Sequence, residues 1–559
     1  MTAFRVWAPG ASAVDLVLDE ARLPMTADQG HWELEAHGSD YGFSLDGGPT
    51  RPDPRSAWQP HGVHALSRTY DHDAFSWTED WTGIPLEEAV LYELHIGTFT
   101  KEGTFDAVIP HLAHLADLGI TTIELLPCNA FDGRWGWGYD GVGWFAVHEP
   151  YGGPDSLKRL VDAAHTHGLG VVMDVVYNHL GPSGNYLPEF GPYLTEKHHT
   201  PWGAAVNLAE PAVRRHILDN AAMWLRDYHL DGLRLDAVHA LIDDSPTHLL
   251  AELSTEVEAL SSTLGRRLWL VAESDLNDPA TVLPRDAGGL GMDGQWCDDV
   301  HHALHTLLTG ERDGYYADFG TLETLAKALR GGFVHDGTWS SFRGRPHGAP
   351  IPREVPGHRL VAYLQDHDQV GNRATGDRPA LSPGLTRIGA AVVLLSPFTP
   401  MLFMGEEYGA RTPWLFFSDH SGDLAEAVRK GRREEFASHG WSTDEIPDPQ
   451  DPATFAASKL DWALDEDLLA FHRSLLDLRR TRDLGGWSEQ VVTVDEQAGT
   501  LAVRRRTTLV VCNLAGHRQE VPIDPTPVGV LLSSAEGWAF APGQVVLEAE
   551  SVLVLDVLP

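Results

Sequence analysis

The strongest constraint on the fold is a series of eight short apolar runs that alternate with amphipathic helical segments between residues 86 and 482. Runs such as LGVVMDVV are apolar at successive positions, which is typical of parallel strands buried on both faces. Eight such strands separated by helices predict an α/β fold, a (β/α)₈ or TIM barrel. The predicted strands are Ala89–Ile96, Ile120–Leu126, Leu169–Val176, Gly232–Leu235, Leu268–Ala272, Gly294–Cys297, Leu360–Leu364 and Pro400–Met404.

Segments with the two-residue periodicity of strands flank this region. The pattern recurs at Val14, Leu16, Leu18, Trp32, Leu34, Tyr41, Phe43 and Leu45, and again in the tail at Leu501, Val503 and VVLEAESVLVLDVLP. It predicts an N-terminal β-sandwich at 1–85 and a small C-terminal β-sandwich at 483–559, with the barrel at 86–482 between them. The third β–α connection, about 177–210, is long enough to form a small subdomain. Packing support and substrate contact both remain open as roles of the terminal units.

The excess of acidic over basic residues limits the classes of molecule that the chain is expected to bind. Its 559 residues include 41 basic and 80 acidic side chains, a formal charge of −39. Such a charge repels phosphate backbones and anionic lipids, so we expect neither nucleic acid nor a membrane as a partner. The start MTAFRVWAPG lacks the pattern of a secretory leader, and the cysteines are only Cys128, Cys297 and Cys512. Both features favour a cytoplasmic location.

Three carboxylates follow predicted barrel strands, where barrel enzymes place their catalytic groups. Asp236 ends the fourth run, Glu273 ends the fifth, and Asp368 follows the seventh. One carboxylate at such a position is explained by capping of the next helix. Three such carboxylates at the ends of predicted barrel strands favour an active site. Glycoside hydrolysis needs one carboxylate as nucleophile or base and one carboxylic acid to protonate the leaving oxygen, so the trio predicts a glycosidase.

The surroundings of two carboxylates predict different roles. Arg234 lies two residues before Asp236, so both side chains share one face of a strand. A guanidinium there would keep Asp236 ionised and oriented, as a nucleophile requires. Glu273 has no basic neighbour in the sequence. Burial would raise its pKa and keep it protonated, as a general acid requires.

Histidine and aromatic residues near these motifs are candidates for sugar binding. His179, His239 and His367 lie beside the strand ends, where imidazoles can bind sugar hydroxyls. The segment RWGWGYDGVGW, after the second strand, sets aromatic residues between glycines. Its aromatic faces either stack on sugar rings or plug the barrel mouth. Tyr139 is the member that we expect to be functional.

Metal ligation is not expected. The chain has 29 histidines but no HExxH motif and no zinc-type spacing of Cys and His. The pairs His198–His199 and His301–His302 are expected in loops or at loop edges, where sugar binding or solvation fits better than a metal. No acidic cluster typical of a calcium site occurs in the third β–α connection.

Four short motifs resemble those of the α-amylase superfamily, glycoside hydrolase family 13. They are DVVYNH at 174–179, GLRLDAVH at 232–239, VAES at 271–274 and LQDHDQ at 364–369. The resemblance implies that Asp236 is the nucleophile, that Glu273 is the general acid/base and that Asp368 stabilises the distorted sugar ring. It further implies a retaining mechanism, with Arg234, His179 and His367 around that ring and Tyr139 as a stacking platform. FRVWAPGASAVDLVL resembles the carbohydrate-binding-like N-terminal sandwich of several members.

Longer segments resemble the trehalose-releasing branch of that family. They are LPEFGPYLTEKHHTPWGAAVN, WCDDVHHALHTLLTGERDGYYADF and PMLFMGEEYGARTPWLFFSDH. This similarity implies hydrolysis of the α-1,4 bond next to the terminal trehalose of maltooligosyltrehalose, with maltodextrin as the second product and no cofactor. A maltooligosyltrehalose synthase would act upstream. The further substrate-binding residues implied are Asp298, His301, His302, Gln369 and Asn372.

Two other functions remain open at this point. A glycogen branching or debranching enzyme of the same fold would share the four motifs. A non-catalytic glucan-binding protein would share the fold, although such proteins typically lose a catalytic carboxylate.

Overall fold

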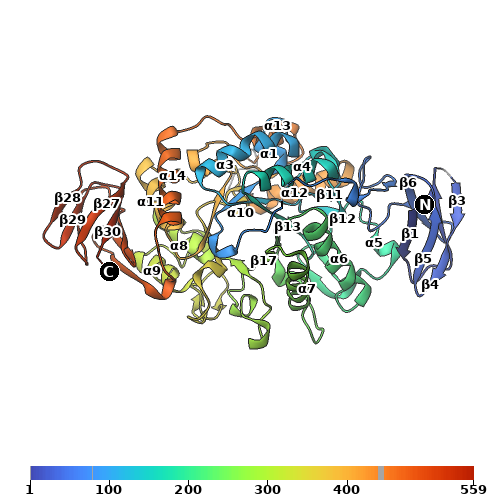
Figure 1. The fold of residues 1–559 in the computed structure, drawn as a ribbon, viewed down its shortest axis with the longest axis horizontal. Coiled ribbons are helices and arrows are strands. Elements are labelled where there is room, and N and C mark those ends of the chain that lie inside the picture. Colours follow the sequence, from blue (N-terminus) through green and yellow to red (C-terminus); the bar gives the residue numbers. More distant parts are fainter. Residues whose placement is uncertain (1, 20, 79, 438–445, 559) are drawn as a thin grey trace.

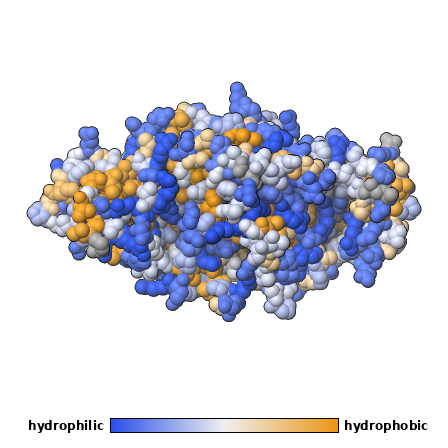
Figure 2. Space-filling view, viewed as in Figure 1, coloured by the Kyte–Doolittle hydropathy of each residue, from blue (hydrophilic) through white to orange (hydrophobic). Residues whose placement is uncertain are grey.

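The computed structural model describes residues 2–19, 21–78, 80–437 and 446–558. Figure 1 shows an elongated molecule with a central barrel between a β unit at the N-terminal end and another at the C-terminal end. Hydrophilic residues cover most of the face seen in Figure 2, and hydrophobic ones gather chiefly over the C-terminal sheets at its left end. None of the helices within the described ranges is long and apolar enough to cross a membrane.

All eight predicted barrel strands are confirmed. They close in the order β10-β13-β16-β17-β18-β21-β22-β9, so the first strand pairs with the second and with the last. The pairs are parallel, as the apolar character of both strand faces predicts. The strands are β9 (Leu91–Leu94), β10 (Thr122–Leu125), β13 (Gly170–Val175), β16 (Gly232–Leu235), β17 (Trp269–Ala272), β18 (Gly294–Trp296), β21 (Leu360–Tyr363) and β22 (Thr399–Phe403).

Helices follow the strands and surround the barrel (Figure 1). α4 (Gly153–Thr166) ends just before Gly168, whose φ of 75° suits a residue that terminates a helix. α6 (Pro211–Asp227) begins at a proline, whose missing N–H has no partner in a first turn anyway. The other helices are α1 (Ile96–Phe99), α2 (Phe105–Val108), α3 (Leu112–Leu118), α5 (Leu187–Phe190), α7 (Leu249–Leu264), α8 (Asp298–Thr309), α9 (Leu322–Gly331), α10 (His367–Gly371), α11 (Pro383–Leu394), α12 (Gly422–Ala437), α13 (Pro452–Ala457) and α14 (Glu466–Thr481).

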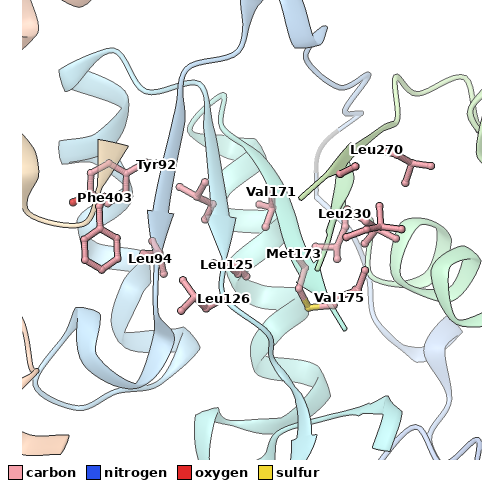
Figure 3. Close-up of a cluster of buried hydrophobic side chains, with 14 of the residues drawn as sticks. Tyr92, Leu94, Leu125, Leu126, Val171, Met173, Val175, Leu230, Leu270 and Phe403 are labelled. Carbon is pink, nitrogen blue, oxygen red and sulfur yellow. The ribbon is translucent and has the colours of Figure 1, made fainter. Parts of the chain in front are cut away.

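Apolar side chains from neighbouring strands fill the space between the barrel and its helices. Figure 3 shows Leu94, Leu125 and Val171 side by side on successive strands, and all three are fully buried. Burial of each such side chain stabilises the fold by about 1.5–3 kcal/mol. This packing fixes the strand ends from which the polar side chains project.

The N-terminal unit consists of two antiparallel sheets. One has the order β1-β5-β4, and the other has the order β3-β2-β6-β7 with β8 also paired to β6. Alternate residues such as Leu16 and Phe43 point into the core between them, as the two-residue periodicity predicts. The strands are β1 (Thr2–Trp7), β2 (Val14–Leu18), β3 (Ala21–Pro24), β4 (Thr26–Asp28), β5 (His31–Ala36), β6 (Asp40–Leu45), β7 (Thr50–Arg51) and β8 (Ser67–Arg68).

The C-terminal unit also has two antiparallel sheets, in the orders β23-β24-β25-β30-β27 and β26-β29-β28. Helix α11 of the barrel packs against β25 and β30, so this unit is fastened to the barrel wall. The strands are β23 (Gln490–Asp495), β24 (Thr500–Arg505), β25 (Thr508–Asn513), β26 (Gln519–Pro522), β27 (Pro527–Ser533), β28 (Ala539–Ala541), β29 (Gln544–Leu547) and β30 (Ser551–Val557).

Three hairpins lie in connections between the barrel strands. They are β11 (Asn129–Phe131) with β12 (Gly141–Val147), β14 (Leu194–Thr200) with β15 (Gly203–Val206), and β19 (Trp339–Ser340) with β20 (Arg345–Pro346). The expectation that both histidine pairs lie in loops or at loop edges is wrong for the second pair, because His301–His302 lie within the hydrogen-bonded helix α8. His198–His199 lie on β14, a strand of the hairpin within the third β–α connection.

Candidate active site

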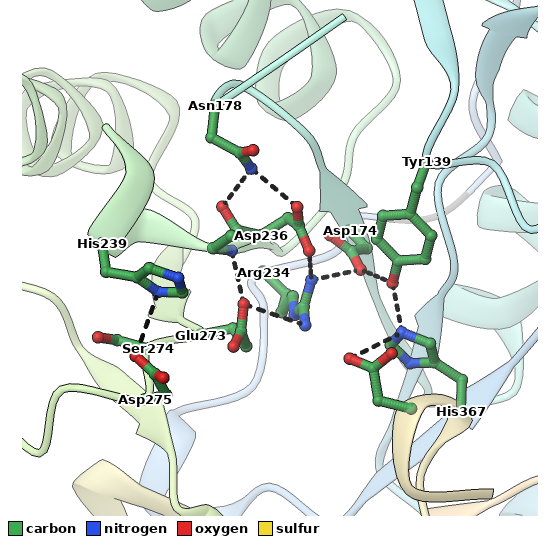
Figure 4. Close-up of polar contacts among 12 residues, drawn as sticks. Tyr139, Asp174, Asn178, Arg234, Asp236, His239, Glu273, Ser274, Asp275 and His367 are labelled. Carbon is green, nitrogen blue, oxygen red and sulfur yellow. Dashed lines mark hydrogen bonds and ion pairs between the residues drawn. The ribbon is translucent and has the colours of Figure 1, made fainter. Parts of the chain in front are cut away.

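Polar side chains from three neighbouring strands converge at the carboxyl end of the barrel (Figure 4). Asp174 on β13 pairs in register with Arg234 on β16, and Arg234 pairs with Val271 on β17. Asp236 and Glu273 follow directly after β16 and β17. Because parallel strands end at the same rim, the register brings the carboxylates around one arginine.

Arg234 is the fully buried centre of this cluster. Its Nη1 donates to Asp174 Oδ2 at 2.8 Å and to Asp236 Oδ1 at 2.9 Å, and its Nη2 lies 3.8 Å from Glu273 Oε2. The guanidinium lies 4.4 Å from the ring centroid of Trp296. Burial alone would lower the pKa of Arg234, but Asp174 and the other surrounding acidic groups raise it well above its usual value. The cation is therefore permanent and neutralises part of the surrounding negative charge.

Asp236 is held on both of its oxygens. Oδ1 accepts from Arg234, and Oδ2 accepts from Asn178 Nδ2 at 2.8 Å. Asn178 is oriented in turn by a 2.5 Å hydrogen bond between its Oδ1 and His179 Nδ1. The carboxylate is thus fixed in position, as a nucleophile that attacks a single carbon atom must be.

Glu273 combines a fixed oxygen with a raised pKa. Its Oε2 accepts from the backbone N–H of Ala237 at 2.6 Å. Ala237 has φ 41° and ψ 52°, a left-handed conformation that costs energy for a residue other than glycine. Burial raises the pKa of Glu273 to about 8, although Arg234 acts in the opposite direction. At neutral pH the side chain is a carboxylic acid with a fixed orientation.

His367 lies on the opposite side of the cluster, where hydrogen bonds join it to Glu93 and to Tyr139. Its Nδ1 lies 2.5 Å from Glu93 Oε1, and its backbone N–H donates to Glu93 Oε2 at 2.8 Å. Burial would lower the pKa of His367, but Asp368 and Glu93 raise it to about 10, so the ring is an imidazolium. Nε2–H therefore donates to the Tyr139 hydroxyl at 2.7 Å, and that hydroxyl donates to Asp174 Oδ2 at 2.6 Å.

Asp368 faces the solvent beside this chain of hydrogen bonds. Its side chain is 41% exposed, and its Oδ2 lies 3.6 Å from His367 Nε2. Its Oδ1 accepts from Asn372 Nδ2 at 3.1 Å. A carboxylate at the open side of the cluster is accessible to the hydroxyls of a bound sugar.

A cavity of about 230 Å³ opens beside Asp368, which forms part of its wall. It gathers four of the five further substrate-binding residues that the sequence predicts, namely Asp298, His302, Gln369 and Asn372, together with the predicted catalytic Asp368. The Tyr363 hydroxyl donates to Asp298, whose pKa is raised to about 6 by burial. His302 is fixed by a hydrogen bond between its Nδ1 and the Asp298 carbonyl, and Gln369 accepts from Tyr316 at 3.2 Å.

Three predicted histidines occupy different environments. His179 stacks on Trp202, with ring centroids 4.5 Å apart. His239 lies beyond Glu273, its Nδ1 3.8 Å from Asp275 Oδ1. His301 is fully buried and stacks between His305 and Tyr363, so it lies behind the cavity wall and not on its surface.

Sequence reasoning missed several residues that the structure brings to the site. Glu93 was the most visible, because it is a charged residue inside the apolar run VLYELHIG. Asp275 and Asn277 also line the cavity. Two of the tryptophans after the second strand, Trp137 and Trp144, are buried in the core, which favours the plug over sugar stacking. Within the described ranges, no group of three or more His, Cys, Asp or Glu residues is arranged to hold a metal ion.

Comparison with known proteins gives consistent matches. Residues 93–202 match the α-amylase catalytic domain family. The chain is 54% identical over 548 residues to a malto-oligosyltrehalose trehalohydrolase of Arthrobacter ramosus, which covers 94% of both proteins. It is 51% identical to an enzyme of the same name from Rhizobium sp. strain M-11, over 99% of this chain and 97% of that one. A crystal structure of a Salmonella typhimurium protein provisionally named as an α-amylase matches with a TM-score of 0.91 and 39% identity, over 99% of this chain and 97% of that one.

Proposed function

Since this chain belongs to the malto-oligosyltrehalose trehalohydrolases, within the α-amylase family, we propose that its carboxylate cluster hydrolyses the α-1,4-glucosidic bond between trehalose and a maltodextrin chain. The observation that carries the proposal is the arrangement of Asp236 and Glu273 around Arg234. One carboxyl is fixed as an oriented nucleophile and the other is held as an acid with a pKa of about 8. A retaining glycosidase needs this pair of groups.

In the first step, an oxygen of Asp236 attacks the anomeric carbon of the glucose that precedes trehalose. The bond from that carbon to O4 of trehalose breaks, and O4 takes the proton of Glu273. Because Oε2 of Glu273 already accepts from Ala237, we assign the proton to Oε1. Trehalose leaves with its hydroxyl restored, and the maltodextrin is held as an ester of Asp236.

In the second step, Glu273 is a carboxylate and takes a proton from water. The water oxygen attacks the anomeric carbon, and the bond to Asp236 breaks. Two displacements at one carbon retain its α configuration. Glu273 and Asp236 return to their starting states, so the cycle balances without a cofactor.

The residues on the open side of the cluster bind the reacting ring. We assign sugar hydroxyls to Asp368, whose side chain is 41% exposed. His367 is buried and both of its ring nitrogens are engaged, so we assign to it the positive charge that lies beside Asp368. Tyr139 forms the wall between them and Asp174. Charged hydrogen-bond partners of this kind can bind the oxocarbenium-like transition state more strongly than the substrate.

A product assay tests the proposed reaction directly. Incubation with maltooligosyltrehalose is expected to release trehalose and a maltodextrin shortened by two glucose units, while maltopentaose under the same conditions is cleaved far more slowly. Chromatography of both reactions measures this. Linear chains from a branched glucan, with no trehalose from maltooligosyltrehalose, would instead identify a debranching enzyme, and glucan binding without any product would identify a binding protein.

A second prediction concerns Glu93, which we assign as a positioning residue for His367. Glu93→Gln removes the charge that helps keep His367 protonated. The amide has one acceptor oxygen, so its N–H₂ must face one of the two N–H groups of His367 that Glu93 binds. The pKa of His367 should fall, and kcat should fall about 10- to 100-fold through misplacement of the ring. Imidazole NMR and kcat measured against pH report the two effects.

Glu124→Gln is the matched control. Glu124 is the buried partner of Glu93 in the strand register, and burial raises its pKa well above the usual value, so it is already neutral. Its replacement removes no charge and should leave His367 nearly unchanged. An unaltered His367 pKa together with an unaltered kcat in Glu93→Gln would contradict the assignment.

The context of the enzyme follows from its substrate. A maltodextrin that ends in trehalose must be supplied by an enzyme that rearranges the reducing end of a glucan, so we place a maltooligosyltrehalose synthase upstream. We place the protein in the cytoplasm, in keeping with its three buried, unpaired cysteines. We assign hydrolysis to residues 86–482, and packing support to the units at 1–85 and 483–559.

A further inference from the structure

A second and larger cavity, of about 750 Å³, lies on the outer side of the loop that follows β21. Its walls come from Leu364–Gln365, the connection from α10 to α11, the start of α11, the turn Glu406–Tyr408 and α14. None of the residues assigned above to catalysis or sugar binding lines it. Its volume lies in the range of about 300–1,000 Å³ that is typical of small-molecule sites.

Three arginines line this cavity although the chain as a whole carries a charge of −39. Among the residues that the structure describes, Arg378 donates only to neutral acceptors, the carbonyls of Thr412 at 2.9 Å and Met404 at 2.8 Å and Gln365 Oε1 at 3.1 Å. Within the described ranges, Arg387 donates only to the carbonyl of Pro383, and Arg411 has no acidic partner. The positive charge in the cavity is therefore available to a ligand.

The acidic residues in the wall offset this charge only in part. Asp377 is engaged by Arg373 at 3.0 Å and by the Thr375 hydroxyl at 2.7 Å. Asp465 accepts from backbone N–H groups at the start of α14. Burial raises the pKa of Glu406 to about 8, so this side chain is neutral at pH 7. The cavity thus has an excess of positive charge.

His472 adds an acceptor to the cavity wall. Its Nδ1–H donates to the Leu468 carbonyl at 3.0 Å, and burial lowers its pKa, so the ring is neutral and Nε2 carries a lone pair. His472 is only 1% exposed, and its Nε2 has no hydrogen-bond partner within the described ranges. Buried polar groups are usually satisfied, so this nitrogen is open to a donor such as a ligand hydroxyl.

We propose that this cavity binds a small anion that also carries hydroxyl groups, of the chemical class of a sugar phosphate. Arg378, Arg387 and Arg411 bind the phosphate, for which the guanidinium fork is well suited, and a sugar hydroxyl donates to His472 Nε2. The site goes beyond the hydrolytic function, because no step of that reaction uses an anion there. Gln365 links it to the loop that carries His367 and Asp368.

Calorimetric titration of the full chain with glucose 6-phosphate tests the proposal, with glucose and inorganic phosphate as separate probes. Glucose 6-phosphate should bind saturably and more tightly than either probe. The double variant Arg387→Gln/Arg411→Gln should bind it at least tenfold more weakly and should still hydrolyse maltooligosyltrehalose at the normal rate. Arg353→Gln, at an exposed arginine outside the cavity, should bind it like the unaltered protein.

The outcomes separate this proposal from the hydrolytic function. Absence of saturable binding by an active enzyme, or equal binding by the double variant, would overturn the site. Equal affinity for inorganic phosphate and glucose 6-phosphate would overturn the role of the hydroxyl. His472→Phe, which keeps a ring of similar size, should weaken glucose 6-phosphate binding while leaving phosphate binding unchanged.

Discussion

Replacement of Asp236 by Asn is expected to lower kcat/KM for maltooligosyltrehalose on the order of 10⁴-fold or more, as loss of a nucleophile does in other enzymes. The amide retains the size of the carboxylate and can still accept from Arg234 Nη1, which lies 2.9 Å from Oδ1. It cannot form the glycosyl ester. The fold should persist, because the buried ion pair between Arg234 and Asp174 remains. Initial rates of trehalose release measure the loss.

The same replacement at an exposed aspartate provides the control. Asp286→Asn, in an exposed turn, should retain normal activity. Circular dichroism should show equal folding of both variants. Peptide mass spectrometry of the unaltered enzyme gives a second test. A glycosyl fluoride whose enzyme ester is hydrolysed slowly should leave a glycosyl group on the Asp236 peptide. Activity of Asp236→Asn above about 1% of normal, or a label on another residue, would contradict the nucleophile assignment.

The barrel could be predicted from the sequence because its signals are local. A buried parallel strand is apolar on both faces, so its pattern appears in the few residues of the strand itself, as in Gly170–Val175. The hairpin β14–β15 was not predicted, because its strand residues Leu194–Thr200 are polar and partly exposed. His301 was misplaced for a related reason. The segment DDVHHALH combines polar and apolar residues, and only the packing of α8 on β21 shows that His301 faces inward.

The sequence predicted those parts of the candidate site that depend on strand ends and on short spacings between residues. Arg234 and Asp236 could be paired because they are two residues apart on one strand. The contact between Glu93 and His367 joins residues 274 positions apart, so no spacing could show it. The left-handed conformation of Ala237 was also invisible, because alanine carries no signal for it. The sequence thus predicts which groups react, whereas their fixation depends on contacts that only the closed barrel creates.

The same arginine contacts the two carboxyls at different distances. Arg234 donates directly to Asp236 at 2.9 Å but lies 3.8 Å from Glu273. The more distant contact does not overcome the burial of Glu273, whose pKa stays raised at about 8. The proposed roles, with Asp236 as nucleophile and Glu273 as acid, agree with the closer contact at Asp236 and with the raised pKa of Glu273.

Replacement of Glu273 by Gln should lower kcat/KM about 10²- to 10⁴-fold, the usual contribution of general acid–base catalysis. It should also abolish the alkaline decline in the pH profile. The pKa of Glu273 is raised from 4.5 to about 8, so the acid is present below pH 8 and is lost as the pH rises through that value. The unaltered enzyme should therefore lose activity above about pH 8. The amide of Glu273→Gln does not titrate, so its residual activity should be flat in that range.

Stereochemistry distinguishes the acid from the nucleophile more sharply than rates do. An α-maltosyl fluoride needs no proton to leave, so Glu273→Ala should still form the ester on Asp236. Azide needs no general base and should attack that ester from the face opposite to Asp236, which yields an α-glycosyl azide with restored turnover. If Glu273 were the nucleophile, azide would displace fluoride directly and yield the β-glycosyl azide. NMR of the product separates the two outcomes, and the β product would reverse the assigned roles of Asp236 and Glu273.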